Sequence, residues 1–253
     1  MQLTYFDSNS WFIEFEGTRI LLDPWFVGNL VFSGADWLFK GSKNQQHSIP
    51  ENIDLILLSQ GLEDHAHPPT LQVLDKAIPV VASPNGAKVA QELGYDSVTT
   101  LEHGDTYTLK NKVEIKALPG SLVGMNTVEN GYFLKGLESG KTMYYEPHGN
   151  HSDEIKNTDS VDVVVTPLIN LKLPIVGSVI KGQKTALELC KLLKPQVILS
   201  TAAGGDIEVE GILTSILQSE GSVEKFNQLL QQNDLSTLAI DLKSGENIEL
   251  SLV

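Results

Sequence analysis

The sequence predicts an α/β protein with a four-layer αββα architecture, in which two mixed β-sheets pack face to face between outer layers of helices. Strand patterns dominate the first third of the chain, helical patterns then alternate with strands, and this order recurs in the second half. Hydrophobic residues make up 41% of the 253 residues, enough to bury a sizeable core. No charge run or Pro/Ser-rich linker divides the chain, so residues 1–253 are expected to form a single domain.

The N-terminal elements are mostly strands. Alternating or β-rich apolar patterns, separated by short turn signals, predict strands over residues 2–7, 10–17 and 18–25. The polar and irregular stretch Phe32–Pro50 is predicted to be a loop or lid. Residues 52–59 form a continuous apolar run that is typical of a buried strand. A loop follows, and a short helix is expected over residues 68–77, because proline favours a helix N-terminus.

Helices enter the pattern from residue 78 onward. Residues 78–101 predict a strand, a helix that begins near Ser83 and Pro84 and ends near Gly94, and a second strand. Further strands are expected at residues 103–109, 112–120, 130–136 and 141–147. The remaining elements are expected as a strand at 161–168, a helix at Lys184–Leu193, a strand at 195–202, a helix at Val223–Gln232 and two closing strands.

Composition narrows the classes of partner. The formal net charge is −14, from 18 Lys and Arg against 32 Asp and Glu. Nucleic-acid binding depends on cationic side chains that displace counterions from phosphates, so neither DNA nor RNA is an expected partner. The same charge disfavours an anionic membrane surface, and no apolar run approaches the length of a membrane span.

The chain has one cysteine, Cys190, which excludes an intramolecular disulfide. Cys190 falls in the helical pattern TALELCKLLK and is predicted to be a buried core thiol. The first residues, MQLTYFDSNSWF, lack the basic segment and apolar core of a secretory signal. We therefore expect a cytoplasmic protein.

The stretch LLSQGLEDHAHPPT, Leu57–Thr70, concentrates candidate metal ligands on a loop at the carboxyl end of a buried strand, a position that commonly carries functional sites. Two carboxylates and two imidazoles lie on it: Glu63, Asp64, His65 and His67. Such groups together suit zinc, iron or manganese. The alternative is structural, in which His65 and Asp64 hydrogen-bond to each other and cap the following turn.

A second cluster, YYEPHGNH, also ends a predicted strand and opens a loop. Its candidate ligands are Glu146, His148 and His151, which can converge on the first cluster; the alternative is a polar loop with exposed histidines. In LLDPW, Asp23 ends a strand before a proline. It either anchors that turn through its own backbone or orients a ligand histidine.

Taken together, these stretches resemble the metallo-β-lactamase fold superfamily, in particular its small metal-dependent hydrolases related to ascorbate-6-phosphate lactonase. Residues 4–25 are similar to the opening strands and Asp-Pro turn of that family, and residues 53–67 lie where it carries a strand followed by T-H-x-H-x-D-H. The stretches KTMYYEPHG, DVVVTPL and TALELCKLLKPQVIL are similar to its later elements. The resemblance implies the αββα sandwich and a site for two metals.

Several ligand positions of that family are altered here. The Asp and His of the motif are kept as Asp64 and His65, and His148 falls at or beside the metal-bridging Asp. Histidines of the family are replaced or absent at positions occupied here by Gln60, Leu62, Ser121–Leu122 and Thr201. A leucine cannot ligate a metal, so an ordinary dinuclear site is not expected.

We therefore expect at most one divalent metal, zinc or iron or manganese, on Asp64, His65 and His148, with Asp64 as a ligand or as the catalytic base. Additional ligands or pocket residues are expected among Gln60, Glu63, His67, Glu146, His151 and Asp23. The expected activity is hydrolysis of a small molecule. Two alternatives stay open: a metal-free pseudoenzyme or binding protein, and a metal-free hydrolase in which Asp64 and His65 form an acid–base pair. The sequence indicates no oligomeric state.

Overall fold

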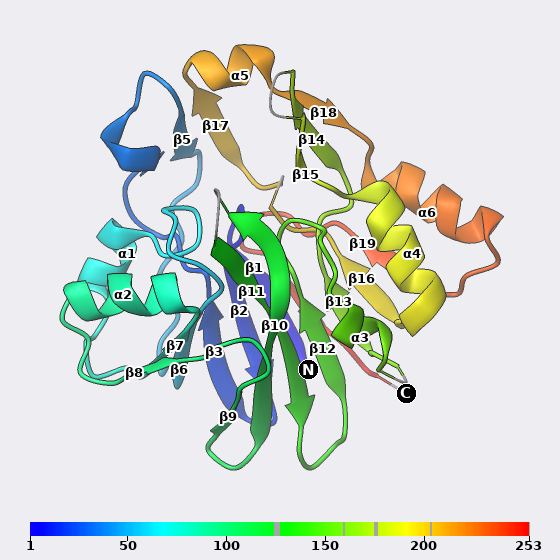
Figure 1. The fold of residues 1–253 in the computed structure, drawn as a ribbon, viewed down its shortest axis with the longest axis horizontal. Helices are drawn as coiled ribbons and strands as arrows, with labels where there is room; N and C mark the ends of the chain where they lie inside the picture. The colour runs from blue at the N-terminus through cyan, green and yellow to red at the C-terminus, as the bar shows by residue number, and fades with distance from the viewer. Residues whose placement is uncertain (124–126, 159, 175–176, 203, 253) are drawn as a thin grey trace.

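The computed structural model describes residues 1–123, 127–158, 160–174, 177–202 and 204–252. Its main feature is a pair of seven-stranded sheets (Figure 1). The first contains, in spatial order, β20 (Asn247–Glu249), β1 (Gln2–Tyr5), β2 (Trp11–Phe15), β3 (Thr18–Leu22), β6 (Leu55–Leu58), β7 (Val80–Ala82) and β8 (Val98–Thr100). The second contains β19 (Leu238–Ile240), β16 (Val197–Leu199), β13 (Val163–Val165), β12 (Thr142–Tyr145), β11 (Thr127–Gly136), β10 (Val113–Val123) and β9 (Thr106–Leu109).

Helices cover the outer face of each sheet. On the first sheet these are α1 (Pro68–Val73) and α2 (Pro84–Glu92), and on the second they are α3 (Asp153–Lys156), α4 (Gln183–Leu193) and α6 (Val223–Gln232) (Figure 1). The order of layers is therefore helix, sheet, sheet, helix, and the predicted αββα sandwich is confirmed. Within the described part of the chain, no helix combines the length and apolar character needed to cross a membrane.

The strand β6 is apolar at every position because both of its faces are buried. Leu55 and Leu57 face the core between the two sheets, whereas Ile56 and Leu58 pack under α1 and α2. Successive strand side chains point to opposite faces, so a strand covered on both sides needs a continuous apolar run. The continuous apolar pattern of residues 52–59 predicted this burial.

The helix α2 confirms its predicted limits. The hydroxyl of Ser83 accepts a hydrogen bond from the Gly86 N–H, which caps the first turn, and Pro84 occupies the start of the helix. Gly94 follows the last turn with φ 80°, a left-handed conformation that favours glycine. The helix α4 begins at Gln183, one residue before its predicted start, and ends at Leu193 as predicted.

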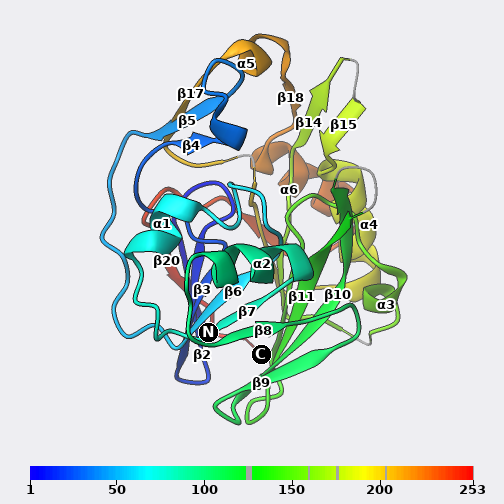
Figure 2. The same ribbon diagram turned by 60° about the vertical axis from the view of Figure 1, so that its left-hand side comes forward.

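Two small sheets lie at one end of the sandwich and were not predicted (Figures 1 and 2). One contains β4 (Leu30–Val31), β5 (Lys40–Lys43) and β17 (Ile207–Glu210), and the other contains β14 (Asn170–Leu173), β15 (Gly177–Ile180) and β18 (Gln218–Glu220). A 3₁₀ turn, η1 (Phe32–Gly34), and the helix α5 (Ile212–Ile216) accompany them. The prediction of a loop over Phe32–Pro50 is therefore wrong at β5, which pairs with β17.

Cys190 lies fully buried in α4, as predicted for a core thiol. Burial raises the pKa of its thiol to about 12, and the thiolate is the reactive form. We expect the native protein not to react with a chromogenic disulfide reagent at pH 8, and to react with one equivalent after unfolding in guanidinium chloride. Rapid stoichiometric labelling of the native protein would contradict this burial.

Candidate metal centre

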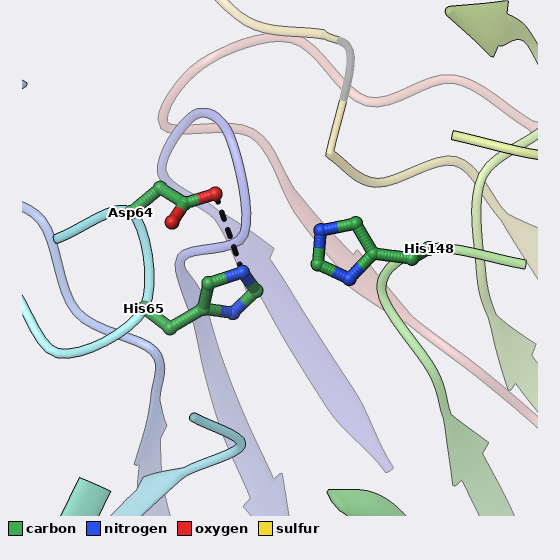
Figure 3. A group of neighbouring side chains, drawn as sticks. All are labelled: Asp64, His65 and His148. Atoms are coloured by element: carbon green, nitrogen blue, oxygen red, sulfur yellow. Dashed lines mark ion pairs between the residues drawn. The ribbon is translucent and has the colours of Figure 1, made fainter. Parts of the chain in front are cut away.

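Three candidate ligands come together at one edge of the sandwich. Asp64 and His65 lie on the loop after β6, and His148 lies on the loop after β12. Their ligand atoms all lie within 4.8 Å of one another, and Figure 3 shows the three side chains pointing toward a common position. The rings of His65 and His148 are 5.3 Å apart at their centroids. The two loops therefore share an edge, as the sequence predicted.

Asp23 fixes the orientation of His65. Its carboxylate Oδ2 lies 2.7 Å from His65 Nδ1 and also accepts hydrogen bonds from the hydroxyls of Ser59 and Tyr145, at 2.5 and 2.7 Å. Asp23 and His65 are both fully buried. With Nδ1–H donated to Asp23, the other ring nitrogen, Nε2, faces Asp64 Oδ2 at 3.3 Å. Asp23 thus orients a candidate ligand histidine, one of its two predicted roles.

The electrostatics of this cluster favour a positive charge at His65 Nε2. Burial alone would lower the pKa of His65, but Asp64 and Asp23 outweigh it and raise that pKa well above its ordinary value. Burial opposes ionisation of Asp64, yet His65 and His148 keep the pKa of Asp64 below its ordinary value. A proton on Nε2 therefore occupies the atom through which His65 would bind a metal, and a cation could replace it.

His148 is oriented by a residue that the sequence analysis missed, Glu129. Nδ1 of His148 lies 2.8 and 3.0 Å from the two carboxylate oxygens of Glu129, which leaves Nε2 as the ring nitrogen available for a metal. Glu129 is fully buried on β11. Burial opposes its ionisation, but His148 outweighs burial and lowers the pKa of Glu129. The signal in the sequence was a lone acidic residue inside a β-rich run, TVENGYF.

Glu146 belongs to a second group of potential ligands, together with Glu129 and His148. Its carboxylate accepts backbone N–H bonds from Gly149 and Asn150, and the hydroxyl of Ser121 at 3.2 Å. Burial and the charge of Glu129 raise the pKa of Glu146 well above its ordinary value, which favours its neutral form. Within this group the carboxylate of Glu129 already has a partner, Nδ1 of His148.

Two predicted site residues point elsewhere. His67 caps α1: its Nδ1 lies 3.0 Å from Thr70 Oγ1, and its Nε2 lies 3.1 Å from the carbonyl of Asn29. Glu63 accepts a hydrogen bond from the Ser33 N–H at 2.8 Å and so fastens η1 to the ligand loop. Neither side chain is brought to the cluster of Asp64, His65 and His148.

Two other predicted residues border the cluster of Asp64, His65 and His148. Gln60 is buried and donates from Nε2 to Glu129 at 3.0 Å, so it supports the carboxylate behind His148. His151 lies 4.0 Å from Glu146 Oε2 through its Nδ1, and the Tyr144 hydroxyl lies 3.4 Å from the same nitrogen. His151 thus adjoins the second group rather than the first.

The altered positions supply no second set of ligands. Leu62 is 41% exposed and carries no donor atom. The hydroxyl of Thr201 accepts from Trp11 Nε1 at 3.0 Å and donates to the Ser8 carbonyl at 3.1 Å. The hydroxyl of Ser121 is engaged with Glu146. The hydroxyls of Thr201 and Ser121 are thus engaged in hydrogen bonds within the protein.

The residues present fit one divalent cation. One carboxylate and two imidazoles, each oriented by a buried acid, are a common donor set for zinc, iron or manganese. Two buried oxygens at this cluster, Asp64 Oδ1 and Asn9 Oδ1, have no hydrogen-bond partner among the described residues. Both are acceptors, so a cation or its water suits the position better than another acceptor.

Comparison with known proteins places these features in a family. The model of the β-lactamase superfamily domain matches residues 2–202. Among solved structures, a metallo hydrolase of the archaeon Ignicoccus hospitalis is 17% identical, with a TM-score of 0.68 and coverage of 99% of both chains. An isothiocyanate hydrolase from Delia radicum gut bacteria is 14% identical, with a TM-score of 0.70 and coverage of 99% of this chain and 100% of that one.

A third similar structure is a diiron β-hydroxylase from Streptomyces venezuelae, which is 15% identical with a TM-score of 0.70. The match covers 98% of this chain and 54% of that one. No curated protein matches the chain. At these identities the solved structures show a shared fold, while the match to the family model spans most of the chain. The protein therefore belongs to the metallo-β-lactamase fold superfamily.

Proposed function

We propose that the protein is a metal-dependent hydrolase of a small molecule, with one divalent metal held by Asp64, His65 and His148. The observation that carries the proposal is the convergence of these three side chains from two distant loops to within 4.8 Å. Each imidazole also has a buried carboxylate on its other nitrogen, which is typical of histidines that bind metals. The metal-dependent hydrolases among similar folds support the reaction class.

The chain's own residues have separate tasks in this proposal. A divalent metal would supply Lewis-acid chemistry, which activates water near neutral pH and polarises a scissile carbonyl or phosphoryl group. Asp23 keeps the proton of His65 on Nδ1, and Glu129 does the same for His148. Asp64 would hold the metal through one carboxylate oxygen, and its Oδ1, which has no partner among the described residues, is free to take up a proton from a water molecule.

A cavity beside the loop that carries His148 has the size of a small-molecule site. It has a volume of about 540 Å³ and is lined by residues 149–151, which directly follow His148, and by side chains of α4. This volume falls in the range of sites for small ligands. The net charge of −14 disfavours polyanionic substrates such as nucleic acids.

A metal-free pseudoenzyme is the second candidate function. It is favoured by one observation: His65 and His148 already have ion-pair partners, Asp23 and Glu129, so the cluster is internally paired without a metal. In that case the acidic and imidazole groups form a polar network that keeps the shape of the pocket.

Elemental analysis tests the proposal. Protein purified without a histidine tag, incubated with zinc, manganese or ferrous iron and dialysed exhaustively, is expected to retain one equivalent per chain. His65→Ala and His148→Ala each remove an imidazole donor and are expected to weaken retention on the order of 10- to 100-fold.

The matched control is His103→Ala, because His103 is exposed and its Nε2 lies 3.2 Å from a backbone carbonyl, that of Glu129. This variant is expected to keep its metal. Two retained equivalents would overturn the mononuclear site, and no retained metal in the unaltered protein would refute the metal-dependent hydrolase and leave the metal-free alternatives.

A further inference from the structure

Asn9 reaches the metal centre from a third segment, the turn Phe6–Ser10 between β1 and β2. Two consecutive residues of this turn, Asp7 and Ser8, have left-handed backbone conformations with φ 73° and 51°. Glycine, asparagine and aspartate adopt such conformations most readily, and for Ser8 the conformation is unfavourable. The turn is fixed from outside, because the carbonyl of Ser8 accepts the Ala202 N–H at 3.0 Å. This turn places Asn9 beside the loop that carries Asp64 and His65.

The side chain of Asn9 is directed into the cluster. It is 1% exposed, and its Nδ2 lies 3.1 Å from His65 Nε2 and 3.5 Å from Asp64 Oδ2. These are the atoms through which His65 and Asp64 would bind a metal. The other amide atom, Oδ1, is buried and has no hydrogen-bond partner among the residues that the structure describes. A buried amide oxygen without a donor is rare in folded proteins.

We propose that Asn9 is a fourth protein ligand of the metal held by Asp64, His65 and His148, and that it binds through its amide oxygen. The proposal rests on the proposed function, since it requires that metal. The two amide atoms of an asparagine exchange places by a half-turn of the side chain. The exchange puts the oxygen where Nδ2 now lies, next to two ligand atoms. Without a cation this oxygen would face a carboxylate, and with a cation it becomes a ligand.

An oxygen atom as the fourth ligand also suits the chemistry of the site. The family positions that lack histidine leave two imidazoles and one carboxylate here, and an amide oxygen adds a neutral, hard donor. Two nitrogen and two oxygen donors suit zinc, ferrous iron or manganese. The competing role for Asn9 is that of a positioning residue, which donates its N–H to Asp64 and never touches the metal.

Replacement by aspartate separates the two roles. Asn9→Asp keeps an oxygen at the same distance along the side chain but has no N–H to donate, whereas Asn9→Ala removes both groups. If Asn9 is a ligand, the aspartate variant retains the metal and the alanine variant does not. If Asn9 only donates a hydrogen bond, the two variants lose affinity together.

The experiment measures zinc and manganese dissociation constants for the full chain by competition with a chromogenic chelator. We expect Asn9→Ala to weaken binding on the order of 10- to 100-fold, and Asn9→Asp to bind within a few-fold of the unaltered protein or more tightly. Asn44→Ala is the matched control, because Asn44 is exposed and bonds Asp206 at the surface.

Equal weakening in both Asn9 variants, or unchanged binding in Asn9→Ala, would overturn the ligand role. If Asn9→Ala does not fold, judged by circular dichroism, the comparison of Asn9→Asp with the unaltered protein decides alone. Failure of the unaltered protein to bind metal refutes the proposed function instead, so the two failures are distinguishable.

Discussion

Asp23→Ala is expected to lower the free energy of unfolding by about 3–5 kcal/mol and to abolish metal retention. The carboxylate of Asp23 is fully buried and receives hydrogen bonds from the Ser59 backbone N–H, the Ser59 hydroxyl, the Tyr145 hydroxyl and His65 Nδ1. Its loss leaves these donors unsatisfied in the interior and removes one of the two negative charges beside a buried imidazole. The ring of His65 also loses the partner that points its Nε2 toward Asp64.

Urea unfolding of metal-free protein, with unfolding slopes compared between variants, measures the effect on stability. Asp23→Asn is a useful intermediate, because it keeps one oxygen acceptor but loses the charge. Asp96→Ala is the matched control: Asp96 is exposed, so the expected change is within about 0.5 kcal/mol. A loss below about 1 kcal/mol for Asp23→Ala would show that Asp23 does not organise this site.

The sequence predicted most of the sandwich because its elements carry local signals. The strand β6 is apolar at every position, and α2 has Ser83 before it and Gly94 after it. The strands of the two small sheets carry no such signal. They are short, and β5 pairs with β17, which lies more than half the chain away. Local periodicity cannot reveal a pairing that depends on where the rest of the fold brings two segments.

Only part of the candidate site could be predicted from the sequence. Asp64, His65 and His148 stand out because carboxylates and imidazoles follow strands in recognisable stretches. Glu129 and Asn9 were missed for different reasons. Glu129 lies inside a strand, where burial of a charge becomes visible only with its partner His148 in place. Asn9 lies in a turn, DSNS, whose composition indicates only a turn.

His67 shows the opposite limit, since it lies in the richest stretch of candidate ligands yet caps a helix. His67 directly precedes α1, and its ring accepts a hydrogen bond from the Thr70 N–H in the first turn of that helix. The helix that follows Pro68 therefore determines its direction, and spacing in the sequence alone does not separate a cap from a ligand.

The second large effect is expected at the turn that carries Asn9, where Asp7 pairs with Lys43. The Lys43 ammonium lies 2.8 Å from Asp7 Oδ2 and 4.6 Å from the centroid of the Trp25 ring, and the two charged side chains are 2% and 0% exposed. Asp7→Asn keeps an oxygen for the Asp206 N–H, which Asp7 Oδ1 now accepts at 2.8 Å. The substitution leaves the Lys43 charge buried without a counter-charge, so we expect a loss of about 3–5 kcal/mol at pH 7.

The pH dependence of this loss follows from the pKa of Asp7. Burial opposes its ionisation, but Lys43 outweighs burial and holds the pKa of Asp7 below its ordinary value. The stabilisation is therefore fully present above the unfolded-state pKa of about 3.9 and is lost as the pH falls through the lower folded-state pKa. We expect the difference in unfolding free energy between the unaltered protein and Asp7→Asn to shrink when urea titrations are repeated at progressively lower pH.

The double variant with Asp7→Asn and Lys43→Met identifies the cause of the loss. Methionine keeps much of the aliphatic length of Lys43 beside Trp25 and removes the buried charge, so the double variant is expected to be more stable than Asp7→Asn alone by roughly 1–4 kcal/mol. Burial already lowers the pKa of Lys43, which shows that the interior disfavours its charge. A double variant no more stable than Asp7→Asn would mean that the loss comes from the hydrogen bonds of the Asp7 carboxylate, and not from an uncompensated ammonium group.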